Sequence, residues 1–410
     1  MHDVWAIGTN VYFKVYGIVI FLFMCTTMNL SFTWEISILG MSIVGLLMAL
    51  LFFFFYPTKF LYTKSNCRLC VMYIIFLGYL LFVSTNFTVD IIRYLTYGVC
   101  GCSVILLPDY LKARLLRIFT LGTCLILLIS IPAWLLYLLG FSLPHGSTDL
   151  YENGFHILTN YYFFLLNGYP GEQLIPRFTS MFLEPGQLAT PCVFLIFAND
   201  ANFRKKEVIL LFIAVILSFS LIGYGLLLGG LFLKSLMSQK YRVLKILSFL
   251  IVVASLFLYI NSSRNKDENA FYALIISRLE YDEEKGIAGN NRTTMFFDNQ
   301  YSKMFESGDQ YLGIADKIDP NFDWTNNPSG WKKFVVKYGL VGLILFSFFC
   351  LILLFKDWSL QGFIYFIVMI VAFIPRSMLP SPYWLYVSIV AFPLLKMQQR
   401  CGLKRNFDVN

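Results

Sequence analysis

The sequence predicts an all-α polytopic integral membrane protein with about twelve crossings of a ~30 Å hydrocarbon core, and three observations support this fold class. Of the 410 residues, 58% are hydrophobic and only 14% are charged, whereas a soluble protein keeps roughly 25% charged residues because its surface faces water. Mean hydropathy is +0.67. Long apolar runs recur along the whole chain, so residues 1–410 form one membrane domain without room for a separate soluble catalytic domain.

The expected crossings follow from the apolar runs and from the charges between them. The runs lie at about 14–33, 36–56, 69–89, 91–108, 118–141, 187–199, 207–234, 246–260, 333–355, 359–379 and 382–396. Eighteen of the 32 Lys and Arg lie in basic connections beside these runs, namely Lys59, Lys64, Arg68, Lys112, Arg114, Arg117, Arg204, Lys205, Lys206, Lys234, Lys240, Arg242, Lys245, Lys356, Lys396, Arg400, Lys404 and Arg405. The positive-inside rule places these connections and both termini in the cytoplasm. The net charge of +8 therefore indicates orientation in a membrane and not binding to nucleic acid.

The segment 207–234 is expected to be a pair of short helices broken at membrane depth. Basic clusters flank both of its ends, so both ends belong on the cytoplasmic side and the segment crosses an even number of times. As one helix it would span only about 42 Å, which is too short for two full crossings. Ser and Gly residues within 218–225 supply a turn, and non-helical backbone at this depth is tolerated where it is buried in protein or lines a wet cavity.

Two long polar stretches, 142–186 and 261–332, are expected to be large loops on the side of the membrane opposite to the termini. The first holds four acidic residues and a single basic one, and the second holds twelve acidic and seven basic residues up to position 331. This acidic balance contrasts with the basic connections, and the parity of the crossings places both loops on the far side.

Several classes of function are disfavoured by what the sequence lacks. A transporter usually has ionisable residues inside its spans, but the apolar runs are almost free of charge, and Arg93 and Arg376 lie near the outer ends of theirs. The three histidines do not have the spacing of a metal site. No phosphate-binding or dinucleotide-binding loop is present. We therefore expect neither a metal nor another cofactor. We expect the functional site at the outer face of the membrane.

The most informative candidate site is the segment RFTSMFLEPG, which begins at Arg177 and leads from the first loop into a span. Arg177 and Glu184 would share one face if this segment were helical. Pro185 is expected at the first position of the following helix, where its missing N–H is harmless. The N-terminal amides of that helix would face the outer interface and favour phosphate. The alternative is a structural Arg–Glu pair that caps the helix.

A second candidate is Arg292 in the second loop, which precedes an apolar stretch and has Arg278 upstream. Arg binds phosphate with a fixed fork geometry and keeps its charge. The alternative for both residues is a solvated surface position.

A third candidate region runs from the second loop into a span. Trp331, Lys332 and Lys333 fit an interfacial anchor. Gly339 and Gly342 fit positions where helices pack closely.

Taken together, these segments resemble the bacterial O-antigen polymerase family, which is part of the O-antigen ligase/polymerase superfamily. The resemblance covers roughly residues 118–345. The family pattern combines two large periplasmic loops with an Arg–x–x–Ser–x–x–x–Glu–Pro-like segment, a Ser/Gly-broken helix pair, an Arg before an apolar turn in the second loop, and a Gly-Leu-x-Gly start of the next span. The matching residues are, in that order, Arg177, Ser180, Glu184 and Pro185; Ser218, Ser220, Gly223 and Gly225; Arg292; and Gly339 to Gly342. The family often has Arg after the Ser of the broken helix pair, and this chain does not.

The resemblance implies a glycosyltransferase with GT-C-like architecture in the bacterial inner membrane. Its substrates would be polyprenyl-pyrophosphate-linked oligosaccharide repeat units, which it would join at the periplasmic face without a cofactor, beside a chain-length regulator protein. The implied catalytic residues are Arg177 and Arg292, which would hold pyrophosphate, and Glu184, which would orient Arg177 or act as a base. Orientation is favoured because a carboxylate beside Arg is a weak base. The implied helpers in pyrophosphate binding are Arg278, Arg376 and Arg93.

Two other classes of function stay open at this stage. An O-antigen ligase or another lipid-linked-sugar glycosyltransferase would share the architecture, but ligases carry a His-Asn pair about eleven residues before the Gly that matches Gly339, and Pro328-Ser329 stand there in this chain. A repeat-unit flippase or transporter would line a midplane cavity with charged residues, which the apolar runs lack.

Overall fold

The computed structural model describes residues 2–34, 38–55, 62–84, 87–146, 148–151, 156–168, 176–237, 281–282, 286–287, 295–314, 330–376 and 380–407. Most of these residues are helical. The helices are α1 (His2–Thr27), η1 (Ser31–Thr33), α2 (Ile38–Phe55), α3 (Lys64–Phe82), α4 (Phe87–Leu106), α5 (Asp109–Leu138), α6 (Pro185–Ala198), α7 (Lys206–Leu217), α8 (Leu221–Met237), α10 (Met295–Glu306), η4 (Asp309–Tyr311), α11 (Gly330–Lys356), α12 (Leu360–Phe373) and α13 (Pro382–Phe407). Every predicted apolar run contains a helix except 246–260, which lies outside the described residues.

Four helices in the described part of the chain are long and apolar enough to cross a membrane. They cover Lys64–Phe82, Val89–Leu106, Asp109–Leu138 and Gly330–Lys356. Their outward faces carry large apolar side chains such as Leu125, which is 61% exposed, and Ile344, which is 64% exposed. Exposed apolar belts of this kind suit lipid and not water. The helices thus indicate a membrane protein.

The predicted break in the segment 207–234 is confirmed, because α7 ends at Leu217 and α8 begins at Leu221. The serines between the two helices satisfy the freed backbone. The hydroxyl of Ser218 accepts from the amide of Ser220 at 3.2 Å, and the hydroxyl of Ser220 accepts from the amide of Gly223 at 3.3 Å. At membrane depth water is scarce, so the backbone groups that are freed at a break between helices need partners of this kind within the protein.

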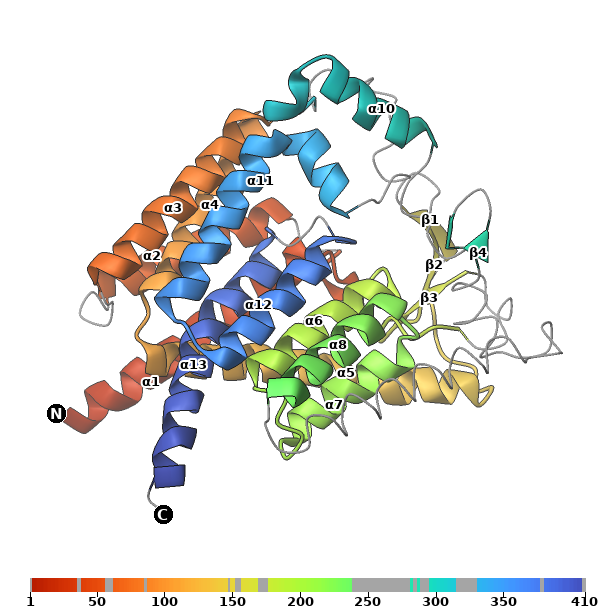
Figure 1. Cartoon of the computed structure of the whole chain (residues 1–410). Coiled ribbons are helices and arrows are strands. Elements are labelled where there is room, and N and C mark those ends of the chain that lie inside the picture. The colour runs from red at the N-terminus through yellow and green to blue at the C-terminus, as the bar shows by residue number, and fades with distance from the viewer. Residues whose placement is uncertain are drawn as a thin grey trace.

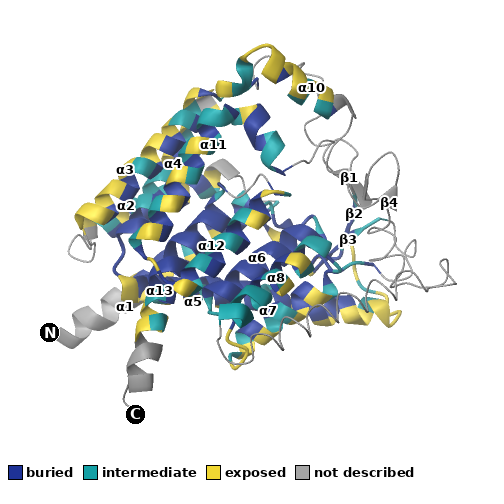
Figure 2. Cartoon of the chain, viewed as in Figure 1, coloured by how far each residue is buried: buried dark blue, intermediate teal, exposed yellow. Residues whose placement is uncertain are grey.

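The core is centred on α6, in which every residue is buried. Helices α7, α8, α12 and α13 pack against it, and Figure 2 shows it in dark blue in the middle of the molecule. Close approach by α8 requires Gly223, because a Cβ there would lie 2.5 Å from the Cβ of Ala189. The start of α6 is thereby enclosed on several sides.

The first loop contains a small antiparallel sheet that was not expected in an all-α protein. Its strands are β1 (Thr148–Tyr151), β2 (His156–Asn160) and β3 (Leu165–Asn167), in the order β1-β2-β3. The second loop adds a short pair, β4 (Tyr281–Asp282) and β5 (Gly286–Ile287). Short hairpins within a polar loop satisfy their own backbone groups, and hydrophobic periodicity over such short stretches is too weak to predict them.

Gly339 interrupts α11, with φ 65° and ψ −178°. The carbonyl of Tyr311 in η4 lies where a Cβ of residue 339 would be. The amide of Ile314 donates to the carbonyl of Val336 at 2.9 Å. The expectation of close packing at Gly339 is therefore correct, but its neighbour is the backbone of the second loop and not another long helix.

Figure 1 shows the two termini at the lower left of the molecule. Helix α10 lies at the top and β1–β3 lie at the right. The sheet of the first loop and helix α10 of the second loop are thus far from both termini.

Candidate functional site

The segment 176–184 carries two of the predicted site residues and is a series of turns, not a helix. Ser180 has a φ of 52°, in the left-handed region that helices avoid. The condition for Arg177 and Glu184 to share a helical face is therefore not met.

Hydrogen bonds hold this segment between α5 and the sheet of the first loop. The hydroxyl of Ser180 donates to Oγ of Ser130 in α5 at 2.8 Å. The hydroxyl of Thr179 donates to the carbonyl of Leu165 in β3 at 2.5 Å, and the amide of Leu165 donates to the carbonyl of Ser180 at 2.7 Å. Buried, satisfied bonds of this kind fix the position of Arg177 at the start of the segment.

Arg177 is bound to the break between α7 and α8. Its Nη2 donates to the carbonyl of Phe219 at 3.1 Å, and the amide of Phe178 donates to the carbonyl of Leu217 at 3.2 Å. Phe219 has a φ of 47°, so its carbonyl is turned away from the direction it would have in a continuous helix. The broken helix pair thus positions a guanidinium group.

Glu184 ends the turns and forms the N-cap of α6, with extended backbone at φ −134° and ψ 148°. Pro185 stands at the first helical position, as the sequence predicted. The amides of Gln187 and Leu188 donate to the carbonyl of Glu184 at 3.0 and 3.2 Å. The Glu184 side chain makes no capping hydrogen bond and lies at the positive end of the α6 dipole.

Glu184 forms an ion pair with Arg376, in which Oε2 and Nη1 are 2.7 Å apart. The side chain of Arg376 is only 9% exposed and that of Glu184 is 25% exposed. The guanidinium group lies against Gly186, where a Cβ would come within 3.2 Å of the Arg376 Cζ. Arg376 is thus the partner that the structure gives to Glu184, and Gly186 makes room for it.

Arg376 follows the end of α12, and its amide donates to the carbonyl of Phe373 at 3.2 Å. The start of α11 joins the same place, because the amide of Trp331 donates to the carbonyl of Ile374 at 3.1 Å. A Cβ at Gly330 would overlap the backbone of Ile374 and Arg376. The first residues of α11 therefore pack beside Arg376.

The polar groups at this place are not all satisfied by protein. In the described part of the chain, the buried Nε of Arg376 and the buried Oε1 of Gln187 have no hydrogen-bond partner. Such groups are uncommon in native structures. Among the described residues, two guanidinium groups, one carboxylate and a helix N-terminus give this place a net positive charge and donor capacity for an anion.

Arg93 is placed differently from the other predicted arginines. It lies in α4 and pairs with Asp90, with Nη1 and Oδ1 2.5 Å apart, and the hydroxyl of Ser84 also donates to Asp90. Among the described residues, no hydrogen bond or ion pair joins Arg93 to Glu184 or Arg376. Its charge is compensated locally.

Arg278 and Arg292 lie outside the described residues. Their predicted roles in pyrophosphate binding therefore stay predictions.

Three structural roles were not anticipated, two of them at this site. Asp90, away from the site, is the partner of Arg93, and this pair is visible in the sequence as an i, i+3 pair. Gly186 and Gly330 are needed for close approach to Arg376, and no local sequence signal separates them from the other glycines.

No three His, Cys, Asp or Glu side chains gather at a metal-binding distance within the part of the chain that the structure describes. The chain matches no protein-family model, no curated protein and no solved structure.

Proposed function

We propose that this protein is a glycosyltransferase of the O-antigen polymerase type. It joins oligosaccharide repeat units that are carried on polyprenyl pyrophosphate, at the periplasmic face of the bacterial inner membrane. The proposal rests on the resemblance of the segments around Arg177, Glu184, Ser218–Ser220 and Gly339 to that family, and on the way these segments are arranged.

The observation that carries the proposal is that the α7–α8 break, which binds Arg177, and the Glu184–Arg376 pair both lie at the start of α6, where a Cβ at Gly186 would be 3.5 Å from Ser220 Oγ and close to the Arg376 guanidinium. Arg177 is bound to the α7–α8 break, next to the serines that match the family pattern. Arg376 is bound to Glu184, which matches the family's Glu–Pro. Arg376 is buried and Arg177 is half-buried, and guanidinium groups near a helix N-terminus are suited to pyrophosphate, because Arg offers paired donors in fixed geometry.

The reaction requires the protein mainly to orient the two lipid-linked units and to stabilise the charge on the leaving pyrophosphate. The hydroxyl oxygen of the incoming unit forms a bond to the anomeric carbon of the growing chain. The bond from that carbon to the pyrophosphate oxygen breaks, its electron pair leaves with the lipid pyrophosphate, and the hydroxyl proton passes to solvent. Arg177 and Arg376 stabilise the charge that develops on the pyrophosphate. Glu184 is a positioning residue, because a carboxylate paired with Arg is a poor base.

The proposal includes a topology of about twelve crossings with a GT-C-like arrangement and both termini in the cytoplasm. Two features support it. The basic connections lie between the apolar runs, and β1–β3 and α10, which belong to the polar loops, lie far from the termini (Figure 1).

The test is a lipopolysaccharide gel from a deletion strain that is complemented with wild type, Arg177→Ala, Arg376→Ala or Arg292→Ala, with expression verified in each. Wild type is expected to restore a ladder, and Arg177→Ala and Arg376→Ala to leave core with one repeat unit. Arg204→Ala is the matched control, because Arg204 is exposed in the connection between α6 and α7; it should give a full ladder.

Other outcomes separate the rival classes. A deletion that leaves bare core while long lipid-linked polymer accumulates identifies a ligase. Bare core with single units retained on the cytoplasmic side identifies a flippase. Full ladders from Arg177→Ala and Arg376→Ala would show that the site is wrong, whatever the family.

A further inference from the structure

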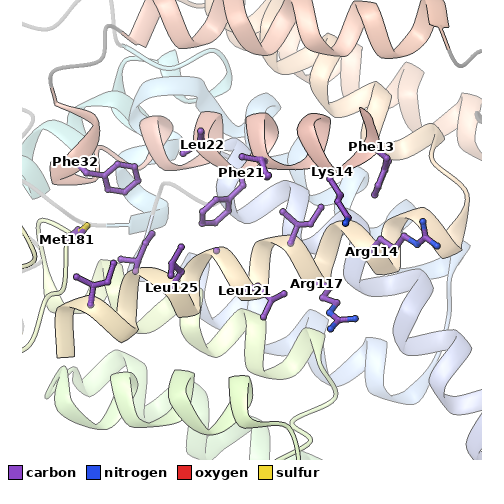
Figure 3. A pocket seen from close by; sticks show the side chains of 15 residues that line it. Phe13, Lys14, Phe21, Leu22, Phe32, Arg114, Arg117, Leu121, Leu125 and Met181 are labelled. Atoms are coloured by element: carbon purple, nitrogen blue, oxygen red, sulfur yellow. The ribbon is translucent and has the colours of Figure 1, made fainter. Parts of the chain in front are cut away.

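A groove of about 900 Å³ lies between α1 and α5 and extends to η1 and Met181. Its walls are almost entirely apolar and include Ile18, Leu22, Leu125 and Ile129. Figure 3 shows side chains from α1 and α5 facing each other across it.

Contact between the two helices closes the floor of this groove. A Cβ at Gly17 would lie 2.5 Å from Ile118, and a Cβ at Gly122 would lie 2.5 Å from the ring of Phe21. The small residues therefore allow α1 and α5 to meet directly. The outer walls are open, because Leu125 is 61% exposed. A chain-like apolar ligand could lie along the contact line.

Three cationic side chains, Lys14, Arg114 and Arg117, line the groove toward one end. Figure 3 shows them away from Phe32 and Met181, which lie at the other end. All three are exposed, and none of the described residues that line the groove is acidic. Within the described residues, Lys14 and Arg117 form no ion pair.

We propose that this groove binds an anionic phospholipid of the cytoplasmic leaflet, with its phosphate between Lys14, Arg114 and Arg117 and one acyl chain along α1 and α5. Charge complementarity selects the headgroup, because Lys14 and Arg117 form no ion pair within the described residues and therefore favour a phosphate over a zwitterion. The apolar walls select a lipid over a soluble phosphate.

The placement of the charges fits one leaflet. The positive-inside rule puts Arg114 and Arg117 at the cytoplasmic interface, where anionic lipids make the surface potential negative. From Arg114 to Ile129 the groove follows α5 for about 22 Å, which is longer than one leaflet of a ~30 Å core and so accommodates a full acyl chain. This proposal does not depend on the proposed enzymatic function.

The test is native mass spectrometry of the full chain in detergent, titrated with dioleoyl phosphatidylglycerol or with dioleoyl phosphatidylcholine. Wild type should bind the anionic lipid more tightly. The Lys14→Gln/Arg114→Gln/Arg117→Gln variant should lose this preference, with a weakening on the order of tenfold, since each cation near a membrane surface contributes to anionic lipid binding. Leu125→Trp, which fills the groove without changing charge, should weaken binding of both lipids.

The matched control is Arg68→Gln/Arg204→Gln/Lys206→Gln, which removes three exposed basic residues elsewhere and should keep the wild-type preference. Equal weakening in the control and the groove variant would overturn the proposal, because it would show a general charge effect. The proposal also fails if polyprenyl phosphate displaces phosphatidylglycerol at far lower concentration, which would assign the groove to the lipid of the substrate. Size-exclusion profiles confirm that each variant is folded.

Discussion

The candidate site at the start of α6 and the groove between α1 and α5 both contain arginines, but they use them in opposite ways. At the site, Arg376 is buried, bound to Glu184 and packed against Gly186. In the groove, Arg117 is exposed and has no ion pair within the described residues. Buried, fixed charges can stabilise a developing charge without reorganisation, whereas exposed ones suit binding to the headgroup of a membrane lipid.

Substitution of Arg376 should have the largest effect. Arg376→Ala leaves Glu184 without the partner to which it is bound at 2.7 Å, and breaking a buried ion pair costs about 3–5 kcal/mol. We expect a loss of this size in the free energy of unfolding, measured by denaturation in detergent, and loss of the polymer ladder. The Arg376→Ala/Glu184→Gln double variant should recover part of the stability but not the ladder. Equal stability of the single variant and wild type would show that the pair does not form.

Gly186→Ala should have the next largest effect. The added Cβ would meet the guanidinium of Arg376, and overpacking of this kind costs about 1–3 kcal/mol. The measurement is again denaturation, with Gly78→Ala as the control, because nothing lies within 4 Å of a Cβ at that helical position. If Gly186→Ala lowers the free energy of unfolding no more than Gly78→Ala does, the site tolerates a larger residue and is less closely packed than described.

Arg93→Ala should have a small effect on stability. Its side chain is 38% exposed and its ion pair with Asp90 is local, so the loss should stay below about 1 kcal/mol. The ladder should persist, since no hydrogen bond or ion pair within the described residues links Arg93 to the site. A ladder reduced as strongly as by Arg376→Ala would restore Arg93 to the pyrophosphate-binding residues that the resemblance implied.

The smallest effect is expected for Arg117→Gln in the groove. An exposed residue without an ion pair changes the free energy of unfolding by no more than about 0.5 kcal/mol, and the ladder should be unchanged. Lipid binding is the property that should respond. A clear loss of stability in lipid-free detergent would mean that Arg117 has a structural role.

The sequence predicted the elements of the fold well where the signal is local. Hydrophobic length located the helices, and charge parity together with the serines at 218 and 220 predicted the break between α7 and α8. Pro185 predicted the start of α6. Each of these features depends on residues that are neighbours along the chain, and periodicity and capping chemistry read such neighbours directly.

The partner of Glu184 could not be predicted in the same way. Arg177 is the nearest basic residue in the sequence, but the segment between them forms turns, and the ion pair is made with Arg376 from the other end of the chain. A signal was present, because an Arg within an apolar run needs a partner. The identity of that partner depends on how α6 and α12 pack. Patterns among neighbouring residues of a single sequence do not reveal this packing.

The most direct test of the central claim is polymerisation in proteoliposomes that contain only purified protein and a synthetic polyprenyl-pyrophosphate-linked repeat unit. Wild type and the surface variant Arg204→Gln should form polymers of two or more units. Arg376→Gln, which keeps a polar side chain but removes the guanidinium, should leave the repeat unit unjoined. Polymer of wild-type length from Arg376→Gln would contradict the assignment of the α6 site to pyrophosphate binding.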